Sequence, residues 1–326
     1  MNPAFILHGA LVSLLFLVSL IPFIREQVWW LRAFTYARLQ KLGLATVFLA
    51  VQLAFFGWDS WQDGLMFILL GVTILICLFD ILPFTIVGGK QVKKVKRPDD
   101  PSRTIKLLVG NVLMENDDHA GLIGHIHAHD PDVIFLVETN QTWRGYLRAV
   151  EDSYPYSWLL PLEDFNGMLL YSKFPLSEIC QRRLVQDHIP SVRLDMELPG
   201  GQDIAFYGLH PRPPRPQDDT EDLDKELLMV ADEVGARDDP IIVTGDLNDV
   251  GWSTTTKRFI RTSGLRDPRR GRGLYNTYNA KNPLARWPLD HVFHSKHFDL
   301  VEMQRLSGFG SDHFPIYIEL ALKPQV

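Results

Sequence analysis

Cysteine is scarce in this 326-residue sequence and positive charge is in deficit, and each shortage excludes a class of protein. The two cysteines, Cys77 and Cys180, lie far apart along the chain, so they cannot form a disulfide framework or a cysteine zinc site. The formal net charge is −6, and residues 98–326 alone carry 24 basic and 35 acidic side chains, a net charge of −11. Because non-specific affinity for a polyanion comes from Lys and Arg, this balance excludes a bulk cationic nucleic-acid binder.

The N-terminal third is instead rich in long hydrophobic runs. Three of them, at about 4–24, 42–58 and 65–87, each approach the roughly 20 residues that a helix needs to cross a bilayer. We therefore predict a membrane anchor over residues 1–97 with three transmembrane helices. A cleaved signal peptide is the alternative for the first run, but the N-terminus lacks a basic segment and two more runs follow. Asp80 interrupts the third run, and we expect it to snorkel or to pack between helices.

The segments that connect these runs differ in charge. The link between the second and third runs has Asp59 and Asp63 and no basic residue, whereas the other two segments are basic. Their basic residues are Arg25, Arg32, Arg38 and Lys41, and then Lys90, Lys93, Lys94, Lys96 and Arg97. By the positive-inside rule both basic segments face the cytoplasm. We therefore expect a multi-pass protein of the cell inner membrane with its C-terminal domain in the cytoplasm.

From residue 98 onward the pattern becomes that of a soluble domain. Short apolar or alternating runs predict strands at 105–109, 133–137, 167–171, 192–198, 204–209, 241–244, 291–294 and 316–320. Helix-like spacing occurs between them, at 119–128, 142–151, 219–234 and 255–263. The sequence therefore predicts one mixed α/β domain over residues 98–326, a size at which a single large core is normal.

Polar residues directly follow several of these predicted strands. They are Asn111, Glu138, His210, Asp246 and Asn248, with Asp290, Asp312 and His313 in two later motifs. Taken singly, each fits a turn residue, a helix cap or a satisfied histidine. The full series is hard to explain by turns alone, because strand ends are where α/β proteins gather functional groups.

The chemistry of this set suits a hard divalent cation. Glu138, Asn111 and the neighbouring aspartates offer oxygen ligands, which Mg²⁺ and Mn²⁺ prefer. His313, next to Asp312, is a histidine whose basicity a carboxylate can set. No serine or cysteine stands in an evident nucleophile setting. Metal-assisted attack of water on a phosphate ester needs these parts.

The motifs also resemble those of a known family. In chain order they are Gly110-Asn111, Val137-Glu138-Thr139, Gly208-Leu209-His210, Gly245-Asp246-Leu247-Asn248, Leu289-Asp290-His291 and Gly310-Ser311-Asp312-His313-Phe314-Pro315-Ile316. This series resembles the endonuclease/exonuclease/phosphatase superfamily, with the deoxyribonuclease-I-like fold, across residues 103–322. The resemblance implies a four-layered α/β sandwich, in which two mixed β-sheets pack face to face with helices outside, here preceded by the three transmembrane helices.

The same resemblance implies roles for single residues. The metal, Mg²⁺ or Mn²⁺, would be held by Asn111, Glu138 and Asp312. The implied catalytic residues are His210 as a phosphate contact or acid, Asp246 and Asn248 as orienters of water and the transition state, and Asp290 as the support of His313.

We therefore predict a membrane-anchored, metal-dependent phosphodiesterase of nuclease-like character. Its substrate is a phosphodiester, either nucleic acid or a phospholipid or inositol-phosphate headgroup, the second as in a sphingomyelinase-like enzyme. A catalytically silent membrane-bound binding module is the remaining alternative, and no obligate protein partner is expected. The acidic balance argues against a long DNA footprint, although the basic stretch 257–272 could contact phosphates if it is not simply a solvated loop.

Overall fold

The computed structural model describes residues 2–24, 28–214 and 220–324, and these form two compact units. The N-terminal unit extends to Gly88 and includes a short piece that ends at Thr220. The second unit contains Gly89–Pro213 and the chain from Glu221 onward.

The N-terminal unit is helical. Its α-helices are Pro3–Leu20 (α1), Trp29–Tyr36 (α2), Arg38–Val51 (α3) and Trp61–Ile81 (α4), with short helical turns at Ile21–Phe23 (η1), Gln52–Phe56 (η2) and Leu82–Phe84 (η3). Three continuous helices are long and apolar enough to cross a membrane, namely Pro3–Phe23, Arg38–Phe56 and Trp61–Phe84. They match the three predicted runs to within a few residues. The short α2 was not predicted, and Arg25 lies outside the described residues.

A buried ion pair explains the acidic residue in the third apolar run. Arg38 Nε lies 2.7 Å from Asp80 Oδ2, and Arg38 also donates a hydrogen bond to the Ser19 backbone oxygen. Each of the two charged side chains is less than a tenth exposed. A buried charge is costly unless it is paired. This pair gives Asp80 a helix-packing role and lets α3 begin at Arg38, earlier than the uncharged run at 42–58 suggested.

The second unit contains two mixed β-sheets. The six-stranded sheet has the order β10-β11-β1-β2-β4-β3 and the five-stranded sheet the order β5-β6-β7-β8-β9. The strands are Thr104–Asn111 (β1), Val133–Val137 (β2), Tyr156–Leu160 (β3), Met168–Ser172 (β4), Leu176–Arg182 (β5), Ser191–Glu197 (β6), Asp203–Leu209 (β7), Ile241–Asp246 (β8), Asp290–His294 (β9), Phe298–Arg305 (β10) and Ile316–Leu322 (β11). Only β1–β2 and β7–β8 pair in parallel among them, with Val109 opposite Phe135 and Tyr207 opposite Val243.

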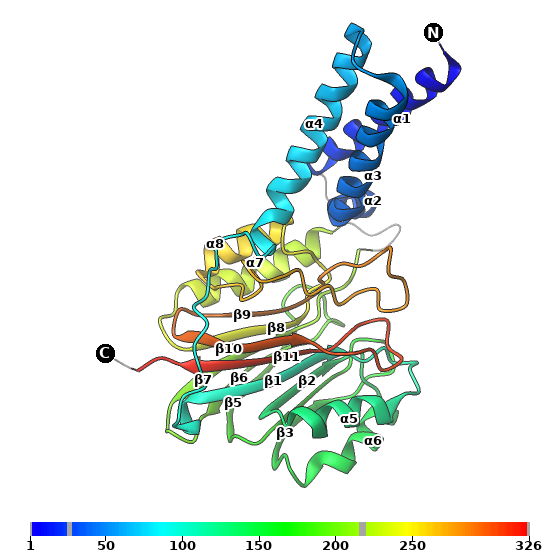
Figure 1. Cartoon of the computed structure of the whole chain (residues 1–326). Helices are drawn as coiled ribbons and strands as arrows, with labels where there is room; N and C mark the ends of the chain where they lie inside the picture. Colours follow the sequence, from blue (N-terminus) through cyan, green and yellow to red (C-terminus); the bar gives the residue numbers. More distant parts are fainter. Residues whose placement is uncertain (1, 25–27, 215–219, 325–326) are drawn as a thin grey trace. The chain divides into compact units, whose positions relative to one another are not determined.

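Apolar side chains from both sheets form the central core. Phe135 of β2 and Phe206 of β7 meet edge to face, with ring centroids 5.5 Å apart. Helices His119–His129 (α5) and Gln141–Glu151 (α6) bury their apolar faces on the six-stranded sheet. Helices Glu221–Gly235 (α7) and Thr254–Ser263 (α8) cover the five-stranded sheet (Figure 1). These four layers confirm the predicted sandwich.

The predicted helices are all present, but three strands were missed. β5 is an edge strand whose side chains are largely polar and exposed, so it lacks the apolar alternation of a half-buried strand. β3 is also an edge strand, and the alternation of β10 is broken by a bulge between Leu300 and Glu302. The helix expected from residue 219 begins at Glu221, after the non-helical Thr220, and residue 219 itself lies outside the described residues.

The segment after the third apolar helix belongs to the second unit. Val92 is fully buried in the core between the sheets, and Val95 N donates a hydrogen bond to the Leu300 backbone oxygen. Arg97 makes a two-pronged ion pair with the fully buried carboxylate of Glu319, at 2.6 and 2.5 Å. The structure therefore places the boundary between the units at Gly88, whereas the sequence suggested residue 97.

Candidate active site

The topology brings the predicted site residues to one edge of the sandwich. β1 and β2 run in parallel, as do β7 and β8, so each pair ends at the same edge of its sheet. β9 and β11 run antiparallel to their neighbours β8 and β1, so they begin at that edge. The residues at these ends are Asn111, Glu138, His210, Asp246, Asp290 and His313.

Asn111 links two carboxylates at the centre of this cluster. Its Nδ2 donates to Glu138 Oε1 at 2.8 Å and to Asp246 Oδ2 at 3.1 Å. Its Oδ1 accepts a hydrogen bond from Leu113 N. His210 Nε2 lies 3.9 Å from an oxygen of each carboxylate. The amide of Asn111 therefore braces the two acids in this structure and does not point its oxygen at them.

His313 and Asp290 form a buried dyad beside Asp246. His313 Nδ1 lies 2.7 Å from Asp290 Oδ2, and His313 Nε2 lies 3.5 Å from Asp246 Oδ2. Burial alone would lower the pKa of His313, but the charges of Asp290 and Asp246 outweigh it and raise the pKa to about 10. His313 is therefore a cationic imidazolium at neutral pH, held in one orientation by Asp290.

The pKa values of Asp246 and Glu138 shift in opposite directions. Burial opposes the charge of Asp246, yet the electrostatic interactions with His313 and His210 and a hydrogen bond from Asn111 hold the pKa of Asp246 below its usual range. Burial raises the pKa of Glu138. Asp246 therefore keeps its charge more readily than Glu138 does.

Backbone geometry at the motifs explains two of their glycines. Gly245 has φ +138°, and a Cβ there would collide with the Leu209 backbone oxygen. Gly310 has φ +89°, and a Cβ would collide with the Asn116 side chain. Glu138 itself adopts φ +58°, a conformation uncommon outside glycine that concentrates at functional sites. The glycines of Gly245-Asp246 and Gly310-Ser311 thus permit the close chain approach on which the site depends.

Asn248 and Asp312 take more peripheral places. Asn248 donates its backbone N–H to Asp246 Oδ1 at 2.9 Å and its Nδ2 to the Pro211 backbone oxygen. Asp312 is partly exposed, and its charge adds to those that raise the pKa of His313. Every predicted site residue other than Asp312 therefore contacts another residue of the cluster through its side chain or backbone, and Asp312 lies next to the cluster.

The donor set fits a divalent cation. Asp246, Asp290 and His313 offer ligand atoms that all lie within 4.8 Å of one another. A protonated histidine cannot ligate a metal, however, and His313 already hydrogen-bonds Asp290. The carboxylate of Glu138, next to Asp246 and desolvated, is the better anchor for a hard cation such as Mg²⁺ or Mn²⁺.

Sequence reasoning missed three contributors from the long segment between α8 and β9. The Tyr278 ring lies 5.0 Å from the His313 ring and stacks on Trp287. Thr277 Oγ1 accepts hydrogen bonds from the backbone N–H groups of Leu289 and Asp290. The aromatic residues of this segment were visible in the sequence, but no strand pattern tied them to the site.

The basic stretch 257–272 is not a uniform phosphate-binding surface. Arg269 is 1% exposed, pairs with Asp267 at 2.7 Å and contacts His291 Nδ1. Arg272 donates to the Val92 backbone oxygen. Arg269 is thus a structural residue. It is neither part of a solvated loop nor available to contact phosphates, so both interpretations of the basic stretch are wrong at this position.

Comparison with known proteins agrees with this architecture. Residues 109–313 match the model of the Endonuclease/Exonuclease/phosphatase family. No curated protein matches the chain in sequence. Similar solved structures include an endonuclease/exonuclease/phosphatase from Beutenbergia cavernae, which is 20% identical with a TM-score of 0.53 and covers 68% of this chain and 72% of its own.

Two eukaryotic structures show the same fold. The human Nocturnin catalytic domain is 17% identical with a TM-score of 0.56, and the match covers 72% of this chain and 98% of that one. TDP2 from D. rerio, complexed with a single strand DNA product, is 17% identical with a TM-score of 0.53. The match covers 67% of this chain and 98% of that chain. With the family model matching well over half of the sequence, the chain belongs to the endonuclease/exonuclease/phosphatase family of phosphoric ester hydrolases.

Proposed function

We propose that this chain is a membrane-anchored, divalent-metal-dependent phosphodiesterase that acts on the cytoplasmic side of the inner membrane. The observation that carries the proposal is the buried His313, held by Asp290 at 2.7 Å and facing Asp246 at 3.5 Å, where these two carboxylates raise the pKa of His313 to about 10. A fixed positive charge beside a fixed negative one suits a reaction in which water attacks a phosphate ester.

Each group has a defined task in that reaction. Asp246 accepts a hydrogen bond from the attacking water and orients it, and the Asn248 N–H fixes the other oxygen of this carboxylate. The imidazolium of His313 stabilises the negative charge that builds on the phosphoryl oxygens. His210, 3.9 Å from Glu138 and Asp246, would contact the phosphate or protonate the leaving oxygen.

The metal site that we propose is centred on Glu138. Asn111 holds the Glu138 carboxylate in place and bonds the Asp246 carboxylate beside it, while Asp312 stays a predicted ligand. Mg²⁺ or Mn²⁺ bound there would neutralise phosphate charge and polarise the ester.

Nucleic acid is the substrate that we favour. Tyr278 and Trp287 stack next to His313 with ring centroids 6.0 Å apart, and base–aromatic stacking is a sequence-tolerant way to hold a single strand. The D. rerio TDP2 structure, which has the same fold, contains a single strand DNA product and so supports a nucleic-acid substrate by analogy. The apolar helices favour the second candidate, a phospholipid or inositol-phosphate headgroup.

A substrate screen distinguishes these candidates. The purified full-length chain is assayed in detergent with Mg²⁺ against single-stranded DNA, RNA, phospholipid and inositol phosphate. We expect turnover of single strands, with KM raised when Tyr278 or Trp287 is replaced by Ala. If only lipid headgroups are hydrolysed, the second candidate replaces nucleic acid as the substrate. If no substrate is hydrolysed, the result favours a catalytically silent binding module.

A further inference from the structure

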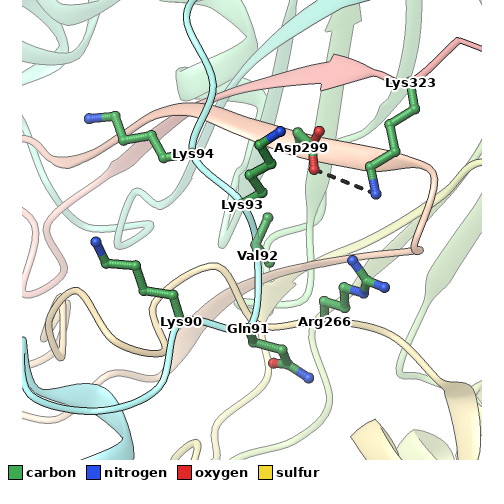
Figure 2. Close-up of a pocket in the computed structure, with 8 residues that line it drawn as sticks. All are labelled: Lys90, Gln91, Val92, Lys93, Lys94, Arg266, Asp299 and Lys323. Atoms are coloured by element: carbon green, nitrogen blue, oxygen red, sulfur yellow. Dashed lines mark ion pairs between the residues drawn. The ribbon is translucent and has the colours of Figure 1, made fainter.

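A basic hollow lies on the second unit, at the segment that follows the third apolar helix (Figure 2). Its volume is about 700 Å³. Its charged lining residues are Lys90, Lys93, Lys94, Arg266, Lys323 and Asp299. Five cations against one acid leave a strong local positive charge in a chain whose net charge is −6.

The wall of this hollow is part of the fold. The buried Val92 anchors the segment in the core. The Lys93 backbone oxygen accepts a hydrogen bond from Leu300 N at 2.9 Å, and Lys94 forms a parallel bridge with Leu300. Gln91 Oε1 accepts from Asp267 N. The lysines are therefore displayed by a segment fixed along β10, and ordering them for a ligand costs little backbone entropy.

The single acid does not neutralise the cations. Asp299 Oδ1 lies 3.5 Å from Lys323 Nζ, and Lys323 also donates to the Lys296 backbone oxygen at 2.7 Å. Figure 2 shows Lys93 and Lys323 on either side of Asp299 and Arg266 on the same side of the segment. The Lys90 and Lys94 side chains extend to the other side of the segment. Gathering like charges in one hollow is unfavourable without an anion, and lysine and arginine donors together match phosphate oxygens.

The position in the chain indicates where the anion comes from. Only five residues lie between Phe84, which ends the third apolar helix, and Lys90. The six Cα-to-Cα steps from Phe84 to Lys90 span at most about 20 Å when extended. The hollow therefore begins within that distance of the point where the helix would leave the hydrocarbon, and the nearest phosphates are those of the lipid headgroups.

We propose that this hollow binds the phosphate headgroup of an anionic membrane lipid in the leaflet next to the third apolar helix. Clusters of Lys and Arg directly after a membrane span recognise such headgroups. The binding would hold the catalytic unit against the bilayer surface. It is independent of the chemistry at the strand ends, since no residue of the hollow is among the site residues.

Lipid retention by the full-length chain tests the proposal. The chain is purified in a neutral detergent and titrated with phosphatidylglycerol or phosphatidylcholine, and bound lipids are counted by native mass spectrometry. The test variant is Arg266→Gln with Lys323→Gln, which leaves the lysines that bear on membrane topology unchanged. The matched control is Arg148→Gln with Arg183→Gln, two exposed arginines on the same unit. Unchanged thermal unfolding of both variants confirms that they fold.

We expect the wild-type chain to prefer phosphatidylglycerol, and the test variant to bind it roughly 30-fold more weakly while the control does not. Equal retention by the wild type and the test variant would overturn the proposal, as would an equal loss in the control. Displacement of the lipid by inorganic phosphate at equal concentration would make the hollow a free-anion site. Tighter binding of a single-stranded oligonucleotide that the test variant loses would make it a nucleic-acid site. Either result would also overturn the proposal.

Discussion

In the proposed mechanism the two residues of the His313–Asp290 dyad have different roles: His313 acts on the substrate, and Asp290 positions His313. Asp290 N is held by Thr277, and its carboxylate contacts His313 at 2.7 Å. Burial would lower the pKa of His313, and the charges of Asp290 and Asp246 raise it to about 10. Removing one of these charges therefore lowers the pKa of His313.

We accordingly predict that Asp290→Asn shifts the pH profile of kcat. The alkaline limb, where His313 loses its proton, moves to lower pH, and kcat at neutral pH falls by roughly 10²-fold or more. Rates measured from pH 6 to 10 check this, with Asp312→Asn as a milder comparison. A uniform fall in kcat at every pH would show that Asp290 has only a structural role.

A buried histidine away from the site predicts how acid affects stability. Burial lowers the pKa of His294 to about 4, from 6.5 for an exposed histidine. The folded state therefore favours neutral His294, so this contribution is present above pH 6.5 and is lost as pH falls towards 4. Denaturant unfolding at pH 7 and pH 4.5 should show a smaller acid loss in His294→Gln, by up to about 3 kcal/mol. An identical acid loss in both proteins would contradict the assignment.

At the residue scale, the gathering of most candidate site residues at one edge of the sandwich could be predicted, because these polar groups directly follow apolar strands. Asn111 and Asp246 are the last residues of β1 and β8, so their place was readable from local sequence. Tyr278, Trp287 and Arg269 could not be assigned in this way. They lie in a long segment between α8 and β9, and only tertiary packing sets their partners.

The composition of segment 89–97 does not reveal that this segment packs against the second unit. Val92 and Val95 are isolated among lysines, so no hydrophobic run marks them, yet Val92 is fully buried. Arg97 is the ion-pair partner of the fully buried carboxylate of Glu319. Loss of one partner of a buried charge is more damaging than loss of an exposed pair.

We predict that a fragment of residues 89–326 is more stable than one of residues 98–326. The shorter fragment loses the packing of Val92 and leaves Glu319 without Arg97, which together cost about 3 kcal/mol or more. Denaturant unfolding of the two fragments measures the difference, and Arg97→Gln in the longer fragment isolates the contribution of the ion pair. Equal unfolding midpoints would return the boundary to residue 97.

For the molecule as a whole, membrane topology rests on the charge of the connecting segments. The second link, with Asp59 and Asp63, is acidic, and the segment from Lys90 to Arg97 is basic. By the positive-inside rule we propose that the catalytic unit lies in the cytoplasm. Lys90, Lys93 and Lys94 of this segment also line the basic hollow, so the proposed topology and the proposed lipid binding both depend on the same segment.

Reporter fusions test this topology. A fluorescent protein fused at the C-terminus should fold and fluoresce, whereas alkaline phosphatase should be inactive there and active when inserted between Asp59 and Asp63. The reverse pattern would place the catalytic unit on the opposite side of the membrane from the cytoplasm and would contradict the predicted topology.

Metal-dependent turnover tests the central claim most directly. The full-length chain is assayed on a generic phosphodiester after chelation, and Mg²⁺, Mn²⁺ or Zn²⁺ is then restored. We predict that activity vanishes with the chelator and returns with Mg²⁺ or Mn²⁺, and that Glu138→Gln and His313→Ala each lower kcat by roughly 10²- to 10⁴-fold without loss of folding. Full activity after chelation, rescue by Zn²⁺ alone, or wild-type rates in both variants would contradict the account.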